Sequence, residues 1–298
     1  MIAPAAAALR DRLRWQLVAA AATPMDATGA TDPALCRRYL RGLLTDGADA
    51  LAVLAHTGRG PHLDAATRDV ITGCAVDTGV PVIVGVGGRP GEHTDQVATE
   101  AARAASLGAA GVLLFPVDGD PLAHHDAIWQ ASGLPMLAFD LYLRPYRPAH
   151  LTALLTHPGV AGVKVARLHD AMACQATLAA AHAADRLAVT GEDRMFGPSL
   201  MWGAQAALVG LAAAAVPVAA TVLRAFAEQR YADFVAASAR LDRLAEVTFT
   251  EPMEGYVRRM LWIAADEGRI PPGYAVDPYG PALTEDDRAR VLAVARRA

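Results

Sequence analysis

A single lysine marks the position in this sequence that is best suited to covalent chemistry. The chain has 27 basic residues, and all of them except Lys164 are arginine. Lys164 lies within the apolar run Val160 to Val165. A guanidinium stays protonated, whereas a desolvated lysine can lose its proton and attack a carbonyl carbon. Lys164 is therefore a candidate for forming an imine, although a lysine that reaches from a strand end to solvent would also fit.

An imine between Lys164 and a 2-oxo acid would open a defined set of reactions. The protonated imine withdraws electrons from the adjacent carbon, so the bound acid can lose a proton and become an enamine. The enamine can attack an aldehyde and form a carbon-carbon bond. The reverse reaction is retro-aldol cleavage, which releases the aldehyde.

The segments that must position this lysine form a repeating pattern. Short apolar runs recur at intervals of roughly thirty residues, each followed by a helical spacing of apolar positions, which predicts repeated βα units. The expected strands are Trp15–Ala22, Ala50–Ala55, Pro81–Gly87, Gly111–Phe115, Pro135–Leu141, Gly159–Val165, Leu187–Gly191 and Ala207–Leu211. The runs show no polar alternation, as is typical of parallel strands that are covered on both faces. Because no GxGxxG motif follows the first strand, we favour a closed (β/α)₈ TIM barrel over an open dinucleotide-binding sheet.

The sequence divides into two parts that we expect to pack as one structural unit. Residues 1–228 form the predicted barrel, and residues 229–298 form a helical extension that packs on it. The extension has helical patterns at Tyr231–Val247, Pro252–Glu267 and Thr284–Arg297, the last opening with a capping threonine and acidic residues.

Composition excludes several classes of function. The formal charge is -4 and no run of like charges occurs, which does not fit a nucleic-acid-binding protein. No segment is long and apolar enough for a membrane span or a signal peptide, so a cytoplasmic location is expected. The three cysteines lack a CxxC spacing and are expected to be buried free thiols. His124 and His125 are adjacent and not four residues apart, so no metal site is predicted.

The residues around Lys164 resemble those of a known family. Gly162, Val163 and Lys164 at the sixth strand are similar to the G-[IVF]-K motif of the dihydrodipicolinate synthase and N-acetylneuraminate lyase family of Schiff-base aldolases. The resemblance extends from Ala22–Pro24 to Pro281–Thr284. It implies a TIM barrel, a lysine imine without any cofactor, and a homo-oligomer, either a tetramer or a dimer.

A second family motif, Gly-Thr-Thr-Gly-Glu, follows the second strand, where this chain has Ala-His-Thr-Gly-Arg at residues 55–59. The resemblance implies that Thr57 and Gly58 hold the substrate carboxylate, which a hydroxyl and free N–H groups suit, although an ordinary turn would look the same. His56 replaces a threonine of the family's proton relay, and a histidine is a residue type that can move protons, although a lone histidine is as often structural. Arg59 replaces the glutamate.

A third family motif has a tyrosine that transfers protons after the fifth strand, where this chain has Phe139, Asp140, Leu141 and Tyr142. The resemblance places Phe139 in the substrate pocket, but a phenyl ring has no exchangeable proton. Tyr142, Asp140 or His56 must therefore act in its place. The departure makes dihydrodipicolinate synthesis itself an unfavoured assignment.

Two further positions are candidates for contacts at the distal end of the substrate. Arg144 stands where the synthases have an arginine for the second substrate, although surface arginines in loops are common. Gly191, Glu192 and Asp193 match a Gly-[DE]-Asp motif that lines the pocket in the family. For Asp193 we favour capping of the helix expected near Met195.

These observations support three hypotheses. The first is a lyase that forms an imine between Lys164 and pyruvate or another 2-oxo acid and makes or breaks a bond to an aldehyde or a 2-keto-3-deoxy sugar acid. The second is a dehydratase of such a sugar acid, with Asp140 or His56 as the acid. The third is a binding protein that has lost catalysis, against which the retained lysine argues.

Overall fold

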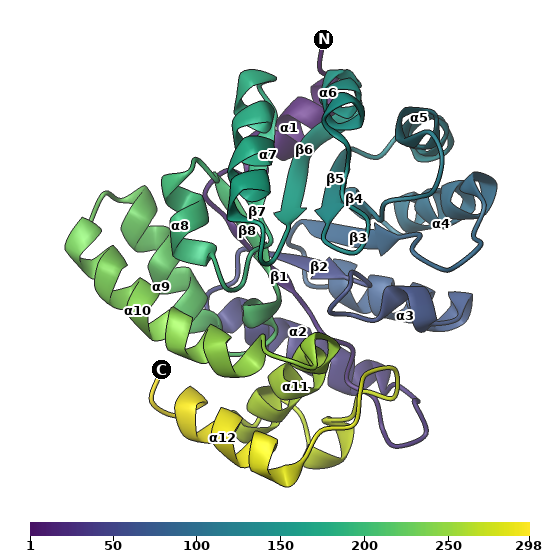
Figure 1. The fold of residues 1–298 in the computed structure, drawn as a ribbon. Coiled ribbons are helices and arrows are strands. Elements are labelled where there is room, and N and C mark those ends of the chain that lie inside the picture. The colour runs from purple at the N-terminus through teal and green to yellow at the C-terminus, as the bar shows by residue number, and fades with distance from the viewer.

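The computed structural model describes residues 1–298 and shows a closed barrel of parallel strands (Figure 1), which confirms the predicted fold. Each strand pairs with the next along the chain, and β8 pairs with β1. The strands are β1 (Leu17–Ala20), β2 (Ala50–Val53), β3 (Val82–Val86), β4 (Gly111–Leu114), β5 (Met136–Leu141), β6 (Val160–Ala166), β7 (Leu187–Thr190) and β8 (Ala206–Val209). All eight were predicted, and the largest differences are at β1, which is four residues shorter than expected, and at β8. Gly210–Ala213, of which only Gly210 and Leu211 were expected to belong to the last strand, is a 3₁₀ turn.

The helices surround the barrel. They are α1 (Pro4–Leu13), α2 (Pro33–Thr45), α3 (Ala65–Val76), α4 (Thr94–Ser106), α5 (Pro121–Ser132), α6 (Pro148–Thr156), α7 (Ala171–Ala183), α8 (Phe196–Met201), α9 (Val216–Ala227), α10 (Tyr231–Thr248), α11 (Tyr256–Asp266) and α12 (Glu285–Ala295). Aspartate side chains cap the first turns of α2, α3, α5 and α7 by accepting from backbone N–H groups. None of the helices combines the length and the apolar character that a bilayer span requires.

The strands are buried on both faces, as their unbroken apolar runs predicted. One set of side chains packs against the helices in a large cluster, and the alternate set fills the barrel interior. Leu9 and Leu13 of α1 close the interior at one end, and α1 lies near the N-terminal ends of the strands (Figure 1). Phe115 and Phe139 lie in the interior set toward the opposite end. The three cysteines are buried free thiols, as expected.

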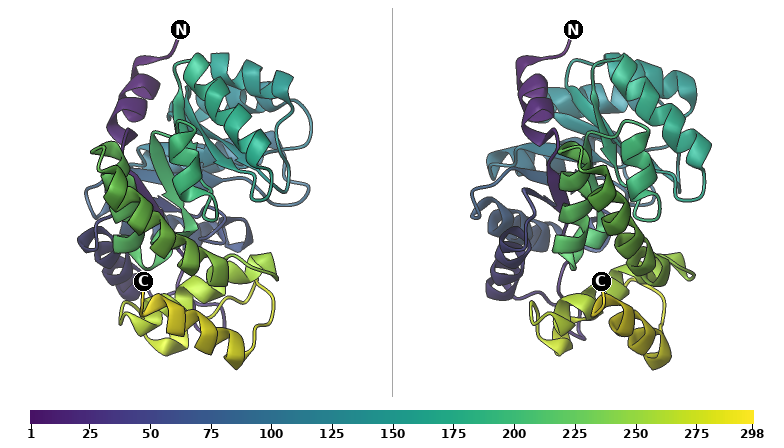
Figure 2. Two further views of the ribbon diagram at one scale, coloured as in Figure 1. Left: turned by 60° about the vertical axis from the view of Figure 1, so that its left-hand side comes forward. Right: turned by 90° about the vertical axis from the view of Figure 1, so that its left-hand side faces the viewer.

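The three C-terminal helices form one layer beside the barrel. Helix α10 packs on α8 and α9, and α11 packs on the turn after β8. Helices α11 and α12 lie on the side to which the strand arrows point (Figures 1 and 2). Helix α11 begins later than predicted because Met253–Gly255 forms a separate 3₁₀ turn before it. Thr284 caps α12 as predicted, since its side chain accepts from the N–H of Asp287.

Candidate active site

Lys164 lies inside the barrel near the carboxyl ends of the strands. The register of β5 and β6 places Phe139 directly beside it, and β7 places Val189 on its other side. Only 5% of Lys164 is exposed. Its Nζ lies 4.3 Å from the centroid of the Phe139 ring, a cation-π arrangement. The carboxyl ends of barrel strands are where active sites of this fold are found.

Burial controls the charge of Lys164. Removal from water disfavours the ammonium and lowers the pKa of Lys164, while the carboxyl groups of Asp193 and Glu192 oppose this shift. Burial also raises the pKa of Asp193, against a hydrogen bond from the backbone and the attraction of Lys164. A larger fraction of this lysine is therefore neutral at moderate pH than of a lysine in water, and the neutral amine is the nucleophile.

Asp193 does not cap a helix, contrary to the expectation from the sequence. Helix α8 begins at Phe196, and its N-cap residue Met195 has no side-chain hydrogen bond. Asp193 Oδ1 instead accepts from the N–H of Leu211 at 2.7 Å, and the residue lines the same pocket as Lys164. The capping prediction was wrong because the chain runs on for two more residues before the helix starts.

Gly191 is required by the lysine itself. A Cβ at this position would lie 2.5 Å from Lys164 Cε and 2.8 Å from the carbonyl oxygen of Val165. The second contact is to backbone, which has little freedom to move. Gly191 also lines the pocket, so its role is to leave the space through which the lysine side chain passes.

Thr57 and Gly58 form a turn with unpaired backbone donors. Both residues are buried, yet neither N–H group makes a hydrogen bond within the chain. Thr57 lines the pocket, and its Oγ1 lies 3.1 Å from the hydroxyl of Tyr256. Buried N–H groups nearly always have partners, so two consecutive free ones beside a pocket are suited to an anion such as a carboxylate.

His56 and Tyr142 meet at the carboxylate of Glu254. The Nε2 of His56 lies 3.2 Å from Glu254 Oε1, and the hydroxyl of Tyr142 donates to the same oxygen at 2.5 Å. Arg59 Nη1 donates to the other oxygen at 2.7 Å. Burial alone would raise the pKa of Glu254, but the contacts with His56, Tyr142 and Arg59 hold this pKa well below its usual range. Burial and the neighbouring Glu254 raise the pKa of Tyr142 far above 10.

Arg59 ties this cluster to the C-terminal layer. Its side chain is 3% exposed and donates to Asp277 at 2.7 Å as well as to Glu254. Asp277 is fully enclosed, with no exposed side-chain surface. The arginine that replaces the family's glutamate therefore has two acidic partners that also lie outside the barrel.

Sequence reasoning missed Glu254, Tyr256 and Asp277. They lie near the start of α11 and in the connector after it, roughly two hundred residues along the chain from His56, so no local spacing links them. The one available signal was the unusual arginine at position 59, because a buried arginine requires acidic partners.

Asp140 lies away from the pocket, although the sequence left it as a candidate proton donor. It follows Phe139 on β5 and therefore faces the opposite side of the strand, toward α7. Its oxygens accept from the N–H of Tyr146 and from the hydroxyl of Thr177, each at 2.9 Å. Burial raises the pKa of Asp140, opposed first by the bond from Tyr146. These contacts fit a structural role.

Glu192 and Arg144 also lie outside the pocket. Both oxygens of the fully buried Glu192 accept from backbone, the N–H groups of Arg167 and Leu168, which fixes the loop after β6. Arg144 is half exposed; it pairs with Asp118 at 3.2 Å and donates to the carbonyl of Pro116. Neither residue is placed to contact a small acid bound at Lys164.

The remaining predicted residues, apart from Gly58, line one cavity. Its lining includes His56, Thr57, Phe139, Tyr142, Lys164 and Gly191, together with Tyr256 and Asp193. Its free volume is about 30 Å³, room for about two water molecules. A molecule of the size of pyruvate therefore enters only when lining side chains move.

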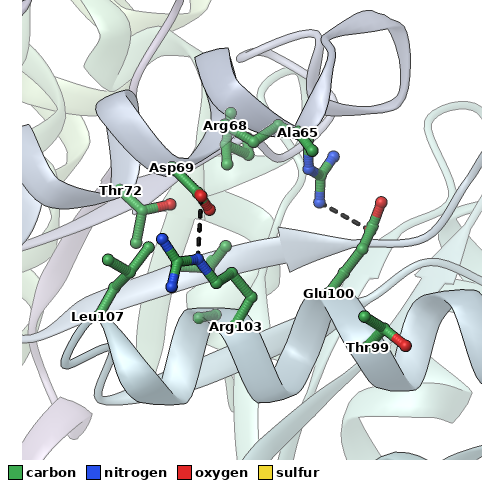
Figure 3. A pocket seen from close by; sticks show the side chains of 11 residues that line it. Ala65, Arg68, Asp69, Thr72, Thr99, Glu100, Arg103 and Leu107 are labelled. Atoms are coloured by element: carbon green, nitrogen blue, oxygen red, sulfur yellow. Dashed lines mark hydrogen bonds and ion pairs between the residues drawn. The ribbon is translucent and has the colours of Figure 1, made fainter.

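A second cavity lies outside the barrel between α3 and α4 (Figure 3). Its volume is about 280 Å³. Ion pairs between Asp69 and Arg103 and between Arg68 and Glu100 cross it. Its lining contains no lysine or other nucleophile of comparable reactivity, so the Lys164 pocket is the candidate active site.

Comparisons with known proteins agree with this geometry. The model of the "Dihydrodipicolinate synthetase family" matches residues 15–296. A 4-hydroxy-tetrahydrodipicolinate synthase from Prochlorococcus marinus (strain MIT 9313) is 32% identical over 63% of this chain and 65% of its own length. One from Stenotrophomonas maltophilia (strain K279a) is 31% identical over 55% of this chain and 58% of its own length. The chain thus aligns with less than two thirds of these relatives.

Solved structures share the fold at low sequence identity. The N-acetylneuraminate lyase of Fusobacterium nucleatum superposes with a TM-score of 0.82 at 16% identity, covering 96% of this chain and 99% of that one. A prophage protein of the dihydrodipicolinic acid synthase family from E. coli K12, solved in complex with pyruvate, has a TM-score of 0.83 at 18% identity, covering 95% and 97%.

The protein is a closed (β/α)₈ barrel with a buried lysine near the carboxyl end of its sixth strand, the end at which this fold carries active sites. Within this class of barrels, the chain belongs to the dihydrodipicolinate synthetase family. Members of this family are class I lyases that act through a lysine imine.

Proposed function

We propose that this protein is a class I lyase that joins Lys164 to pyruvate or a close 2-oxo acid as an imine. The observation that carries the proposal is the only lysine of the chain, buried in the barrel pocket with a lowered pKa. Neutral Nζ attacks the carbonyl carbon and gives a carbinolamine, which takes up one proton as its hydroxyl leaves as water, so a protonated imine remains. The lysine argues against a protein that only binds the acid, because binding alone needs no nucleophile.

The carboxylate of the 2-oxo acid would bind at the turn of Thr57 and Gly58. The Thr57 hydroxyl and the two free N–H groups supply donors at one edge of the pocket. Charge-assisted hydrogen bonds of this kind are stronger than neutral ones and fix orientation. The Phe139 ring beside Nζ supplies an apolar wall, in keeping with its contact to the lysine.

His56 or Tyr142 would carry the protons. Loss of a proton from the carbon next to the imine moves its electron pair toward the imine and gives the neutral enamine. The enamine then forms a bond to the carbonyl carbon of an aldehyde, and a proton returns to the resulting alkoxide. Retro-aldol cleavage of a 2-keto-3-deoxy sugar acid follows the same steps in reverse.

The tyrosine that transfers protons in the synthases is replaced here by Phe139. This replacement favours an aldehyde acceptor other than that of dihydrodipicolinate synthesis. Arg144 pairs with Asp118 at the surface. A dehydratase would need an acid near the leaving oxygen; Asp140 is held elsewhere, which leaves His56 in the pocket as its candidate acid. We propose the aldol reaction, with the dehydratase as the alternative that product analysis separates from it.

Product analysis with a panel of 2-keto-3-deoxy sugar acids tests the proposal. Release of pyruvate together with a free aldehyde, lost in Lys164→Arg, is the expected result. Formation of a dehydrated product without free aldehyde would identify the dehydratase. Turnover that persists in Lys164→Arg would contradict the imine mechanism altogether.

A further inference from the structure

Three replacements in the family motifs come together at one carboxylate. His56, Arg59 and Tyr142 all contact Glu254, which belongs to the C-terminal layer and not to the barrel. The rings of Tyr142 and Tyr256 both lie near His56, with centroids at 6.2 and 6.0 Å. All three side chains line the pocket.

The contact with Glu254 indicates which ring nitrogen of His56 carries the hydrogen. Glu254 is held as a carboxylate by Arg59 and by the other donors, so it can only accept hydrogen bonds. The Nε2 of His56 lies 3.2 Å from Glu254 Oε1, an ion-pair contact without the alignment of a hydrogen bond. A ring nitrogen that presents a lone pair would be repelled by this carboxylate, so the contact favours the tautomer with hydrogen on Nε2. His56 lines the pocket, and in this tautomer Nδ1 is the nitrogen with a lone pair for a ligand.

We infer that Glu254 is a positioning residue that makes His56 the general base of the proposed reaction. It holds the tautomer with hydrogen on Nε2 and balances the positive charge that appears on the imidazole ring when Nδ1 takes a proton, as a carboxylate does for histidine in hydrolase triads. This inference rests on the proposed lyase function and assigns its proton transfer to one residue.

The step is balanced without any added reagent. Nδ1 of His56 takes the proton from the carbon next to the imine of the bound 2-oxo acid. The electron pair of the C–H bond forms the C=C bond of the enamine, and the iminium nitrogen becomes neutral. The imidazolium returns the proton later in the cycle. Tyr142 is a weaker candidate for the base because its hydroxyl hydrogen is engaged by Glu254.

The exchange of pyruvate methyl protons with deuterium isolates this step, because it requires the enamine but no aldehyde. We would follow the exchange in D₂O by proton NMR and, in parallel, trap the imine with borohydride. Glu254→Gln keeps the shape of the side chain but can donate to Nε2. We expect exchange to fall about 100-fold, while trapping at saturating pyruvate is retained.

Matched variants separate positioning from support of the fold. Glu251→Gln changes an exposed carboxylate just before the same 3₁₀ turn, and its exchange rate should stay within about twofold of wild type. Glu254→Asp should recover part of the lost rate. Tyr142→Phe should cost less than tenfold, because it leaves the contact between Glu254 and His56 in place.

A tautomer measurement adds a readout that a structural role would not move. Nitrogen-15 chemical shifts of labelled histidine, assigned with His56→Asn, should show hydrogen on Nε2 in the pyruvate-free wild type and a changed distribution in Glu254→Gln. Exchange within twofold of wild type, an equal loss of trapping and exchange, or an unchanged tautomer in Glu254→Gln would overturn the inference. Failure of the wild type to form any adduct would overturn the proposed function instead, and the tautomer shifts would still report on the contact.

Discussion

At the scale of single residues, the pocket gives the side chain of Lys164 room to extend and keeps it away from water. Lys164 lies against the Phe139 ring and in the space left by Gly191, and the carboxyl groups of Asp193 and Glu192 act on its charge. Burial favours its neutral form, and the two acidic neighbours limit the shift. This balance leaves an amine that is nucleophilic at moderate pH and able to become a protonated imine.

The rate of imine formation should follow the lowered pKa of Lys164. The amine reacts when it is neutral, so the rate at fixed pyruvate should rise with pH and level off below pH 10.5, the pKa of an ordinary lysine. Stopped borohydride quenching at a series of pH values measures this profile. A rate that still rises at pH 10.5 would show that burial does not shift the lysine.

Gly191→Ala should lower both the free energy of unfolding and the rate of imine formation at Lys164. The added Cβ would lie 2.5 Å from Lys164 Cε and 2.8 Å from the Val165 carbonyl oxygen. Overpacking of this kind costs about 2 kcal/mol of the free energy of unfolding, and imine formation should fall as Nζ is displaced. Urea unfolding and borohydride trapping measure the two effects.

Gly73→Ala is the matched control for this substitution. Gly73 lies inside α3 with nothing within 4 Å of the added Cβ. Alanine there should stabilise the helix by about 0.5 kcal/mol and leave trapping unchanged. Equal behaviour of the two variants would contradict the close packing at Gly191.

At the scale of elements, the turn after β2 connects the barrel to the C-terminal layer. Thr57 lines the pocket from this turn, while Arg59, two residues later, contacts Glu254 and Asp277. Thr57 and Arg59 are two residues apart in the same turn. The position of the proposed carboxylate-binding turn therefore depends on the segments around residues 254 and 277, which hold Arg59. Helices outside the barrel thereby contribute to the site.

Asp277→Ala should destabilise the protein because it removes an enclosed partner of a buried arginine. Removing one partner of a buried ion pair lowers the free energy of unfolding by about 3 kcal/mol, although Arg59 still contacts Glu254. Urea unfolding measures this loss. Asp118→Ala, which removes the exposed partner of Arg144, serves as the control and should show no measurable change; a loss as large as that of Asp277→Ala would contradict the reasoning.

The same scale explains which parts of the site were predictable. Apolar runs without alternation located all eight strands, because parallel barrel strands are buried on both faces. Lys164 and Thr57 were found from local motifs. Asp140 was misplaced because it follows a pocket residue on a strand whose side chains alternate. Glu254 was missed because only the tertiary fold brings it to His56.

At the scale of the whole molecule, acid should weaken the fold through buried histidines on α5. His125 is 1% exposed, and burial lowers the pKa of this residue to about 3, against the hydrogen bond to the Pro121 carbonyl. The unfolded chain binds a proton near pH 6.5 and the folded chain does not. This contribution to stability is therefore complete above pH 6.5 and is lost progressively as pH falls toward 3.

A comparison of variants separates the effect of His125 from that of the buried carboxyl groups. The raised pKa of a carboxyl group such as Glu192 makes the folded state more stable as the pH falls, which opposes the effect of His125. Between pH 7 and pH 5 the wild type should lose about 2 kcal/mol more unfolding free energy than His125→Leu. Replacement of the exposed His169 should leave the wild-type slope unchanged. Equal slopes for wild type and His125→Leu would show that His125 is not protected from protonation.

The central claim is that Lys164 forms the imine, and peptide mapping of a reduced pyruvate adduct tests it most directly. Apart from the N-terminal amine, the chain offers only this one amine. After treatment with pyruvate and borohydride, the account predicts one added group, confined to the peptide that contains Lys164 and absent from Lys164→Arg. No adduct with any 2-oxo acid, or an adduct only on the N-terminal amine, would contradict it.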